Sequence, residues 1–179
     1  MTLSSRTKLA AVAAAALALQ PVAVSAQQAC MTEAEVSAVA LYSVPSIIQA
    51  VKLKCAGELA SNGYLARRGD ALSARYAALQ TRTWPRAKSG LLKVLGGRAG
   101  TQGRQTVDMI RSLPDDAVRP LVDALIVQEV SAKIAVSNCS RIELVIEALA
   151  PIDPEIAGTL IGRVVGLVDP DEMPICPRR

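Results

Sequence analysis

The residues of this chain best suited to chemistry are its four cysteines, Cys30, Cys55, Cys139 and Cys176. They are far apart in the sequence and form no CxxC pair, and the chain contains no histidine. Zinc sites are built from closely spaced cysteine and histidine ligands, so this pattern argues against a metal site. An even number of cysteines behind an export signal, described below, instead favours disulfides. We therefore expect structural disulfides and no metal or other cofactor.

Four cysteines allow three pairings, and the sequence alone does not choose among them. Helix geometry favours one pairing if Pro45 separates two antiparallel helices. The chain would then rise ~18 Å over residues 33–44 and return by Cys55, at 1.5 Å per residue. We therefore favour the pairs Cys30–Cys55 and Cys139–Cys176. A single helix through Pro45 would hold Cys30 far from Cys55, so the pairing tests the arrangement of the helices.

The absence of histidine removes most catalytic arrangements, including Ser-His and Cys-His nucleophile pairs. Carboxylate chemistry of the kind that glycosidases perform remains. Glu58 lies near the end of an expected helix and is the candidate acid of a cell-wall glycan hydrolase. Leu59 follows it where lytic transglycosylases carry serine, and a single glutamate near a helix end is usually just solvated. We expect a protein without catalytic activity and keep the Glu58 hydrolase as an alternative.

The glycine-rich stretch GGRAGTQGR, residues 96–104, does not match a phosphate-binding loop. Its glycines have the wrong spacing, Arg104 follows Gly103 where a lysine and a hydroxyl residue would be needed, and no strand precedes it. Successive glycines predict a mobile linker between two short helices.

Basic residues are concentrated in one part of the chain. Residues 67–111 hold ten basic residues against two acidic ones, whereas residues 112–177 hold eleven acidic against four basic. Clustered like charge attracts oppositely charged partners and speeds their encounter. We therefore predict an interaction or adaptor protein that binds an anionic envelope protein or another anionic envelope component. The predicted contact residues are Arg67, Arg68, Arg75, Arg82 and Arg86.

Other interpretations of these arginines stay open. Arg68, Arg75 and Arg82 recur every seven residues, beside an apolar stripe whose surface arginine stems commonly cover. The acidic part of the chain could also neutralise the basic part, in a purely structural or envelope-stress protein. We expect no nucleic-acid partner, because the chain has no Phe, one Trp and three Tyr with which to stack on bases.

The N-terminus matches a secretory signal peptide. Basic residues precede the uncharged run 9–19, and the small residues Val24-Ser25-Ala26 follow it. The run is shorter than the ~20 residues that span a bilayer, and no later stretch is long and charge-free enough. We therefore expect a signal peptide over residues 1–26, one domain over residues 27–179, no transmembrane segment, and a periplasmic or secreted location.

The rest of the sequence predicts helices. Alanine and leucine are abundant, and no segment alternates apolar and polar residues as a strand would. Thr32 with Glu35, and Ser140 with Glu143, have the spacing of capping boxes. The expected fold is all-α, a compact multi-helix bundle of antiparallel helical hairpins. The expected helices cover residues 33–44, 46–61, 65–83, 85–95, 104–113, 115–137, 141–150 and 154–168.

Apolar residues recur at helical spacing within these segments and predict the core. The residues expected to be buried form three stripes: Ile48, Val51, Cys55 and Leu59; Leu65, Leu72, Tyr76 and Leu79; Val122, Ile126, Val130 and Ile134.

Processing of the N-terminus can be measured directly. We expect the intact mass of protein exported into a periplasm to begin at Gln27 and to rise by about four hydrogens on reduction of two disulfides. Lipidation of Cys30 is the alternative, although Gln27, Gln28 and Ala29 are a poor match to a lipoprotein signal. A mass that begins at Cys30 with added acyl chains would contradict the soluble form.

Overall fold

The structure is a computed structural model, which describes residues 30–98, 100–168 and 175–176. The predicted signal peptide, residues 1–26, lies outside the described residues. All regular elements within the described part are helical, so the predicted all-α fold is confirmed. The elements are α3 (Glu33–Lys54), α4 (Tyr64–Arg98), α5 (Gly100–Ser112), α6 (Asp115–Lys133), the 3-10 turn η1 (Val136–Asn138), α7 (Cys139–Leu149) and α8 (Pro154–Val168).

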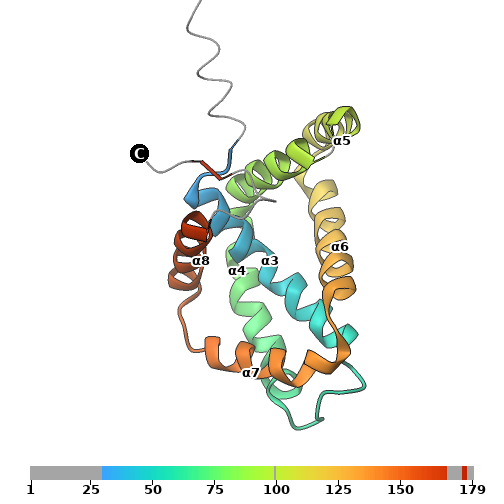
Figure 1. Cartoon of the computed structure of the whole chain (residues 1–179), viewed down its shortest axis with the longest axis vertical. Coiled ribbons are helices and arrows are strands. Elements are labelled where there is room, and N and C mark those ends of the chain that lie inside the picture. Colours follow the sequence, from blue (N-terminus) through green and yellow to red (C-terminus); the bar gives the residue numbers. More distant parts are fainter. Residues whose placement is uncertain (1–29, 99, 169–174, 177–179) are drawn as a thin grey trace, which may run out of the picture.

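Helix α3 is the centre of the arrangement. Figure 1 shows it crossing the middle of the molecule, with α4 behind it, α6 and α8 on opposite sides, and α7 across one end. Helices α3 and α4 run antiparallel, because Glu35 pairs with Lys93 at one end and Lys52 with Asp70 at the other. Thr32 and Glu35 form the predicted capping box at the start of α3.

Helix α3 is continuous through Pro45, so the predicted turn at this residue is wrong. An interior proline costs a helix about 3 kcal/mol through one lost hydrogen bond and a clash. Buried residues continue on both sides of it, among them Tyr42, Ile48 and Val51, and their burial outweighs that cost. The carbonyl of Tyr42, one turn before the proline, also accepts a hydrogen bond of 3.0 Å from Gln80 on α4.

The next two predicted helices are likewise one helix, α4, which contains Pro85. The glycine-rich stretch that we expected to be a linker forms the end of α4 and the start of α5. Ala99, between these two helices, lies outside the described residues.

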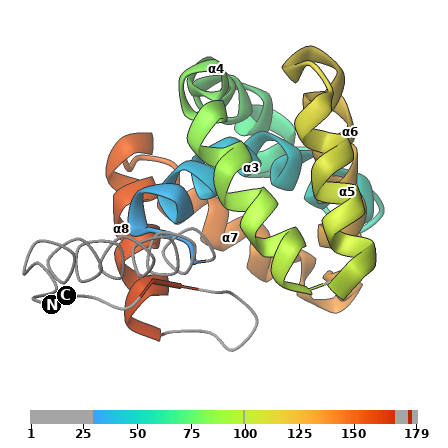
Figure 2. The same cartoon turned by 90° about the horizontal axis from the view of Figure 1, so that it is seen from above.

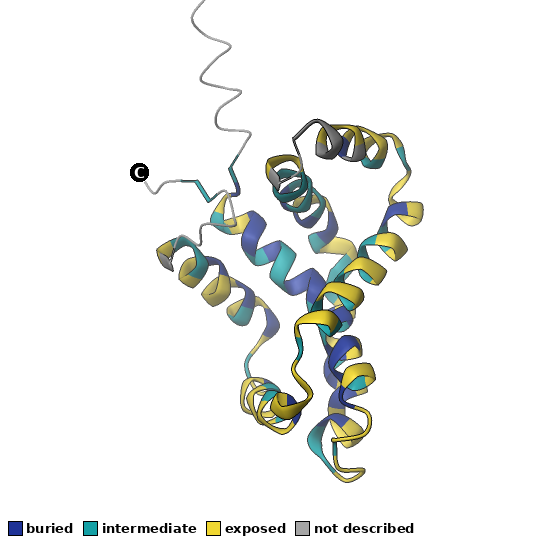
Figure 3. Ribbon diagram, turned by 45° about the vertical axis from the view of Figure 1, so that its right-hand side comes forward, coloured by how far each residue is buried: buried dark blue, intermediate teal, exposed yellow. Residues whose placement is uncertain are grey.

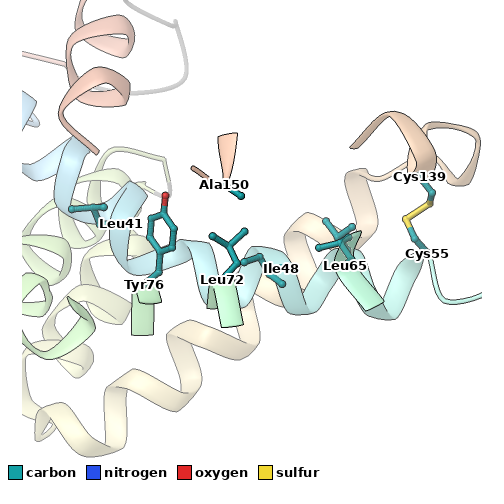
Figure 4. Packing of buried hydrophobic residues seen from close by; sticks show 9 residues of the cluster. Leu41, Ile48, Cys55, Leu65, Leu72, Tyr76, Cys139 and Ala150 are labelled. Atoms are coloured by element: carbon teal, nitrogen blue, oxygen red, sulfur yellow. A yellow bond between two sulfur atoms is a disulfide. The ribbon is translucent and has the colours of Figure 1, made fainter. Parts of the chain in front are cut away.

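Two clusters of buried residues form the core. The first lies along α3 and the first half of α4 and reaches α7 (Figure 4). It includes Ile48, Val51, Leu65, Leu72 and Tyr76, as the predicted stripes require. The second cluster joins α3, α4 and α6 through Ala38, Tyr42, Trp84, Ala87 and Val118.

Helix α8 packs on α3 through glycines. A methyl group at Gly158 would lie 2.6 Å from Leu41 Cγ, and one at Gly162 would lie 2.7 Å from the backbone oxygen of Glu33. These glycines allow the two helices to approach closely. The large apolar residues of α8 therefore point elsewhere, and Leu160 and Leu167 are 50% and 69% exposed.

The disulfides are Cys30–Cys176 and Cys55–Cys139, so the pairing that we favoured is wrong. The reason is the continuity of α3, which holds Cys30 and Cys55 at its opposite ends. Cys139 instead meets Cys55 at the start of α7, with a Cα–Cα distance of 5.6 Å. Cys176 lies beside Cys30 because its N–H donates to the backbone oxygen of Met31 at 2.9 Å.

The second predicted capping box is also wrong. Helix α7 begins at Cys139, and Glu143 does not cap it. Glu143 Oε1 instead accepts a hydrogen bond of 2.8 Å from the N–H of Leu65 in the first turn of α4. A carboxylate is favourable there, since the first N–H groups of a helix lack partners within it.

By length and composition, α3 is the one described helix that could cross a membrane. About half of that stretch is buried inside the fold, against α4, α6 and α8. The central helix of a bundle commonly has this composition.

The disulfide between α3 and α7 should contribute to the stability of the fold. We expect the double variant Cys55→Ser/Cys139→Ser to lose about 4 kcal/mol of unfolding free energy, since the bond closes a loop with a sequence separation of 84. Chemical denaturation of the exported proteins measures this loss. Peptide mapping of the unreduced parent should recover Cys55 joined to Cys139, and a peptide joining Cys30 to Cys55 would contradict the structure.

Candidate functional site

Two of the five predicted contact arginines interact with neighbouring helices. Arg75 Nη1 donates a hydrogen bond of 2.8 Å to the backbone oxygen of Ala150, which caps the end of α7. Helix carboxyl ends carry partial negative charge, so a guanidinium is stabilising there. Arg82 forms an ion pair with Glu155 in the first turn of α8. Arg75 therefore helps to hold α7, whereas the exposed Arg82–Glu155 pair contacts α8 but contributes little to stability.

The other three predicted arginines, Arg67, Arg68 and Arg86, are exposed and form no ion pair with any residue that the structure describes. They are not close together. Arg68 and Arg86 are 18 positions apart on one helix, which corresponds to about 27 Å along its axis. The five arginines therefore do not form one compact surface.

Arg86 borders a hollow of about 540 Å³ between α3, α4 and α8. The charged residues around this hollow are Arg82, Arg86 and Arg163 against Glu33 and Glu155. These charges nearly balance, so the hollow has little electrostatic preference for an anion.

A larger cleft of about 790 Å³ lies between the end of α4 and α5. Figure 2 shows α5 folding back along α4, and the side chain of Val107 on α5 faces Gly96 on α4. Four basic residues and one acidic residue line the cleft: Lys88, Lys93, Arg104, Arg111 and Asp108. The lining of this cleft is therefore more positive than that of the hollow beside Arg86.

The floor of this cleft is organised by a buried carboxylate, Glu35, on α3. Lys93 Nζ donates to its two oxygens at 2.7 and 2.8 Å, and Ser89 Oγ donates to Oε1 at 2.6 Å. Burial alone would raise the pKa of Glu35, but the hydrogen bonds from Lys93, Ser89 and Thr32 outweigh it and lower the pKa. Glu35 is therefore ionised at neutral pH and fixes the position of the Lys93 ammonium.

Lys88 is fixed in a similar way, at 2.9 Å from Asp115 at the start of α6. Its hydrogen bond keeps the pKa of Asp115 below the usual value. Among the residues that the structure describes, Arg111 pairs with Asp108 alone, at 3.5 Å on an exposed turn of the same helix. Arg104 has no ion pair with a described residue. Arg104 and Arg111 are thus the cations of the cleft that are least engaged elsewhere.

A second group of polar side chains lies within the core between α3, α4 and α6. Tyr42 packs on Trp84 with ring centroids 4.9 Å apart, and Ser46 Oγ donates to Asp123 at 3.2 Å. Burial and the nearby carboxylate of Asp123 raise the pKa of Tyr42, and burial raises the pKa of Tyr76. Both phenols therefore stay protonated at neutral pH and are poorly suited to act as bases or nucleophiles.

Glu58, the candidate acid of the hydrolase alternative, lies in the turn after α3. It is exposed and lines neither the cleft nor the hollow described above. The described residues include no group of three or more Cys, Asp or Glu side chains that could hold a metal ion.

The cleft cations Lys88, Lys93, Arg104 and Arg111 were counted in the basic segment of the sequence but were not chosen as contact residues. The glycines between them were a usable signal, because a chain that reverses there brings the residues on either side together. The prediction of a mobile linker there does not bring the flanking residues together, whereas the observed reversal between α4 and α5 does.

Comparisons with protein families, with curated protein sequences and with solved structures give no match for this chain. Its function must therefore be argued from its own residues.

The buried Glu35–Lys93 pair should contribute more to the unfolding free energy than an exposed ion pair does. Removing one partner of a buried pair leaves the other charge unpaired, so we expect Glu35→Gln to cost about 3 kcal/mol of unfolding free energy. The control is Asp70→Asn, which breaks the exposed pair with Lys52 and should cost under about 1 kcal/mol. Denaturant titration measures both losses, and equal losses would contradict the structural role of Glu35.

The same pair predicts a pH dependence. The pKa of Glu35 is lower in the folded protein than its ordinary value of 4.5, so the unfolded chain takes up this proton first as the pH falls. The stabilisation by Glu35 is therefore complete above that value and is lost as the pH drops through the folded pKa. We expect the stability difference between the parent and Glu35→Gln to shrink below about pH 4.5.

Proposed function

We propose that this protein is an exported helical interaction protein, without catalytic activity, that binds an anionic partner in the cleft between α4 and α5. The observation that carries the proposal is the lining of that cleft, with four basic residues from two facing helices and one acidic residue. Positive charge on the walls of a concave site concentrates the field and attracts anions.

The cations of the cleft differ in how they would act. Lys88 and Lys93 are held by Asp115 and Glu35, so their positions are set before any partner arrives. Arg104 and Arg111 are exposed and can turn toward a partner. Arg111 must leave its ion pair with Asp108 to contact a partner. This costs little, since exposed ion pairs contribute under about 1 kcal/mol.

A protein or another anionic component of the cell envelope fits this cleft better than a nucleic acid. Binding of single-stranded nucleic acid depends on exposed aromatic rings. Trp84, Tyr42 and Tyr76 are buried, and Tyr64 is partly buried, which leaves no aromatic platform beside the cations.

Two other functions are weaker candidates. A cell-wall glycan hydrolase would depend on Glu58, which is exposed in the turn after α3 and lines neither the cleft nor the hollow beside Arg86. A purely structural or envelope-stress protein would need no binding site, and the charge of the cleft argues against it.

Charge reversal tests the proposal. We expect the double variant Arg104→Glu/Arg111→Glu to capture at least tenfold less partner from envelope extract than the parent does. The reason is that repulsion of an anion replaces attraction in the cleft. Capture by the parent should also weaken as salt rises, because salt screens exposed charges. Arg75 and Arg82 are unsuitable for this test, since their reversal would also disturb α7 and α8.

The control is Arg67→Glu/Arg68→Glu, which makes the same change in net charge at the far end of α4. It should retain capture, and circular dichroism should show that both variants keep their helices. Equal loss in both variants would mean that only net charge matters, and no capture by the parent would contradict the proposal.

A further inference from the structure

Helix α7 is joined to the rest of the molecule by a disulfide and hydrogen bonds at its two ends, and Ile142 and Ile146 pack on the first core cluster. At its start, the disulfide joins Cys139 to Cys55, and Glu143 accepts from the N–H of Leu65. At its end, Arg75 donates to the backbone oxygen of Ala150. Figure 3 shows that most of α7 is coloured as exposed. Leu144, between the two ends, is 64% exposed.

Two apolar hollows lie on the inner side of α7. The first has a volume of about 530 Å³, and the second, toward α8, has a volume of about 240 Å³. Ile47 on α3 and Ile146 on α7 line both, so the two hollows are neighbours, and we call them together the α7 groove. Other walls of the first hollow are Val51, Val130, Ile134, Ile142 and Val145. The second is lined further by Val44, Ile48, Leu72, Tyr76, Leu160 and Ile161.

Both hollows are open to the surface, so their apolar walls are partly exposed to water. An apolar ligand that covers such walls is stabilised, because apolar surface is removed from water. Water gains little there, since it needs polar partners. Concave sites of this size with apolar walls and a few convergent polar groups are typical of sites for small molecules.

The polar groups of the groove are at one end. Lys133, the last residue of α6, and Arg141, in the first turn of α7, both line the first hollow. Both are exposed, and neither has an ion pair with any described residue. Asn138, the N-cap of α7, lies at the same end and makes no capping hydrogen bond. The groove therefore combines a cationic mouth with an apolar interior.

We propose that the α7 groove binds a long-chain fatty acid, with its carboxylate at Lys133 and Arg141 and its hydrocarbon chain running past Ile47 and Ile146 toward α8. The charge of the mouth matches a carboxylate, and the walls match a hydrocarbon chain. The inner hollow, of about 240 Å³, has apolar walls that suit part of a hydrocarbon chain. This site is separate from the α4–α5 cleft, and its occupant differs from the partner proposed there.

Calorimetric titration of the exported, delipidated protein with palmitate tests this site. We expect saturable binding of one palmitate per chain. Lys133→Gln/Arg141→Gln should weaken palmitate binding at least tenfold but leave the binding of hexadecanol, which has the same chain and no charge, unchanged. The control Arg67→Gln/Arg68→Gln removes the same charge elsewhere and should bind palmitate as the parent does.

A second variant tests the apolar part of the site. Ile47→Trp places a larger side chain in the groove, so it should abolish the binding of both palmitate and hexadecanol. Thermal unfolding checks that this variant still folds. An unfolded Ile47→Trp would be replaced by Val145→Phe, which narrows the same groove from α7.

Three results would overturn the proposal. The first is the absence of saturable palmitate binding by the parent. The second is palmitate binding that a folded, groove-filling variant leaves unchanged. The third is a dimer, seen by sedimentation, that palmitate does not dissociate and that Ile47→Trp disrupts, which would assign the groove to a second copy of the chain.

Discussion

The burial of α3 on several sides is the constraint on which the rest of this structure depends. Helix α4 covers it along its length, α6 meets it near Ser46, and α8 approaches it through glycines. Because the helix cannot break at Pro45 without exposing this surface, its two ends stay far apart. Cys55, at the C-terminal end of α3, then forms the disulfide with Cys139, which attaches α7 at this end. The position of the apolar groove thus follows from the continuity of one helix.

Positive charge in this chain serves two purposes. Arg75 and Arg82 are used within the molecule, where they contact the end of α7 and the start of α8. Lys88 and Lys93 are paired with carboxylates but still line the cleft. A count of charges along the sequence does not distinguish these roles, since the role of each cation depends on which carboxylate or carbonyl the fold brings to it.

The sequence was sufficient for features that depend on neighbouring residues. The helical class, the Thr32–Glu35 capping box and the buried residues of the stripes on α3 and α4 follow from local spacing, whereas the predicted stripe on α6 is only partly buried. Features set by packing between distant helices were mispredicted. The pattern at Ser140 and Glu143 resembles that at Thr32 and Glu35, yet Glu143 accepts a hydrogen bond from Leu65, 78 residues before it, in the first turn of α4. Nothing local distinguishes the two patterns. The cleft cations were visible in the composition, but their grouping required α5 to fold back.

The two disulfides are nested, and Cys30 with Cys176 joins the first and last described residues. The backbone between these two cysteines is therefore a covalent ring, with Cys55–Cys139 as a bridge across it. A protease that cuts one loop of this ring releases no fragment, because the new ends remain linked through sulfur. In an oxidising compartment that contains proteases, a chain nicked once would remain a single molecule and could hold its helices together.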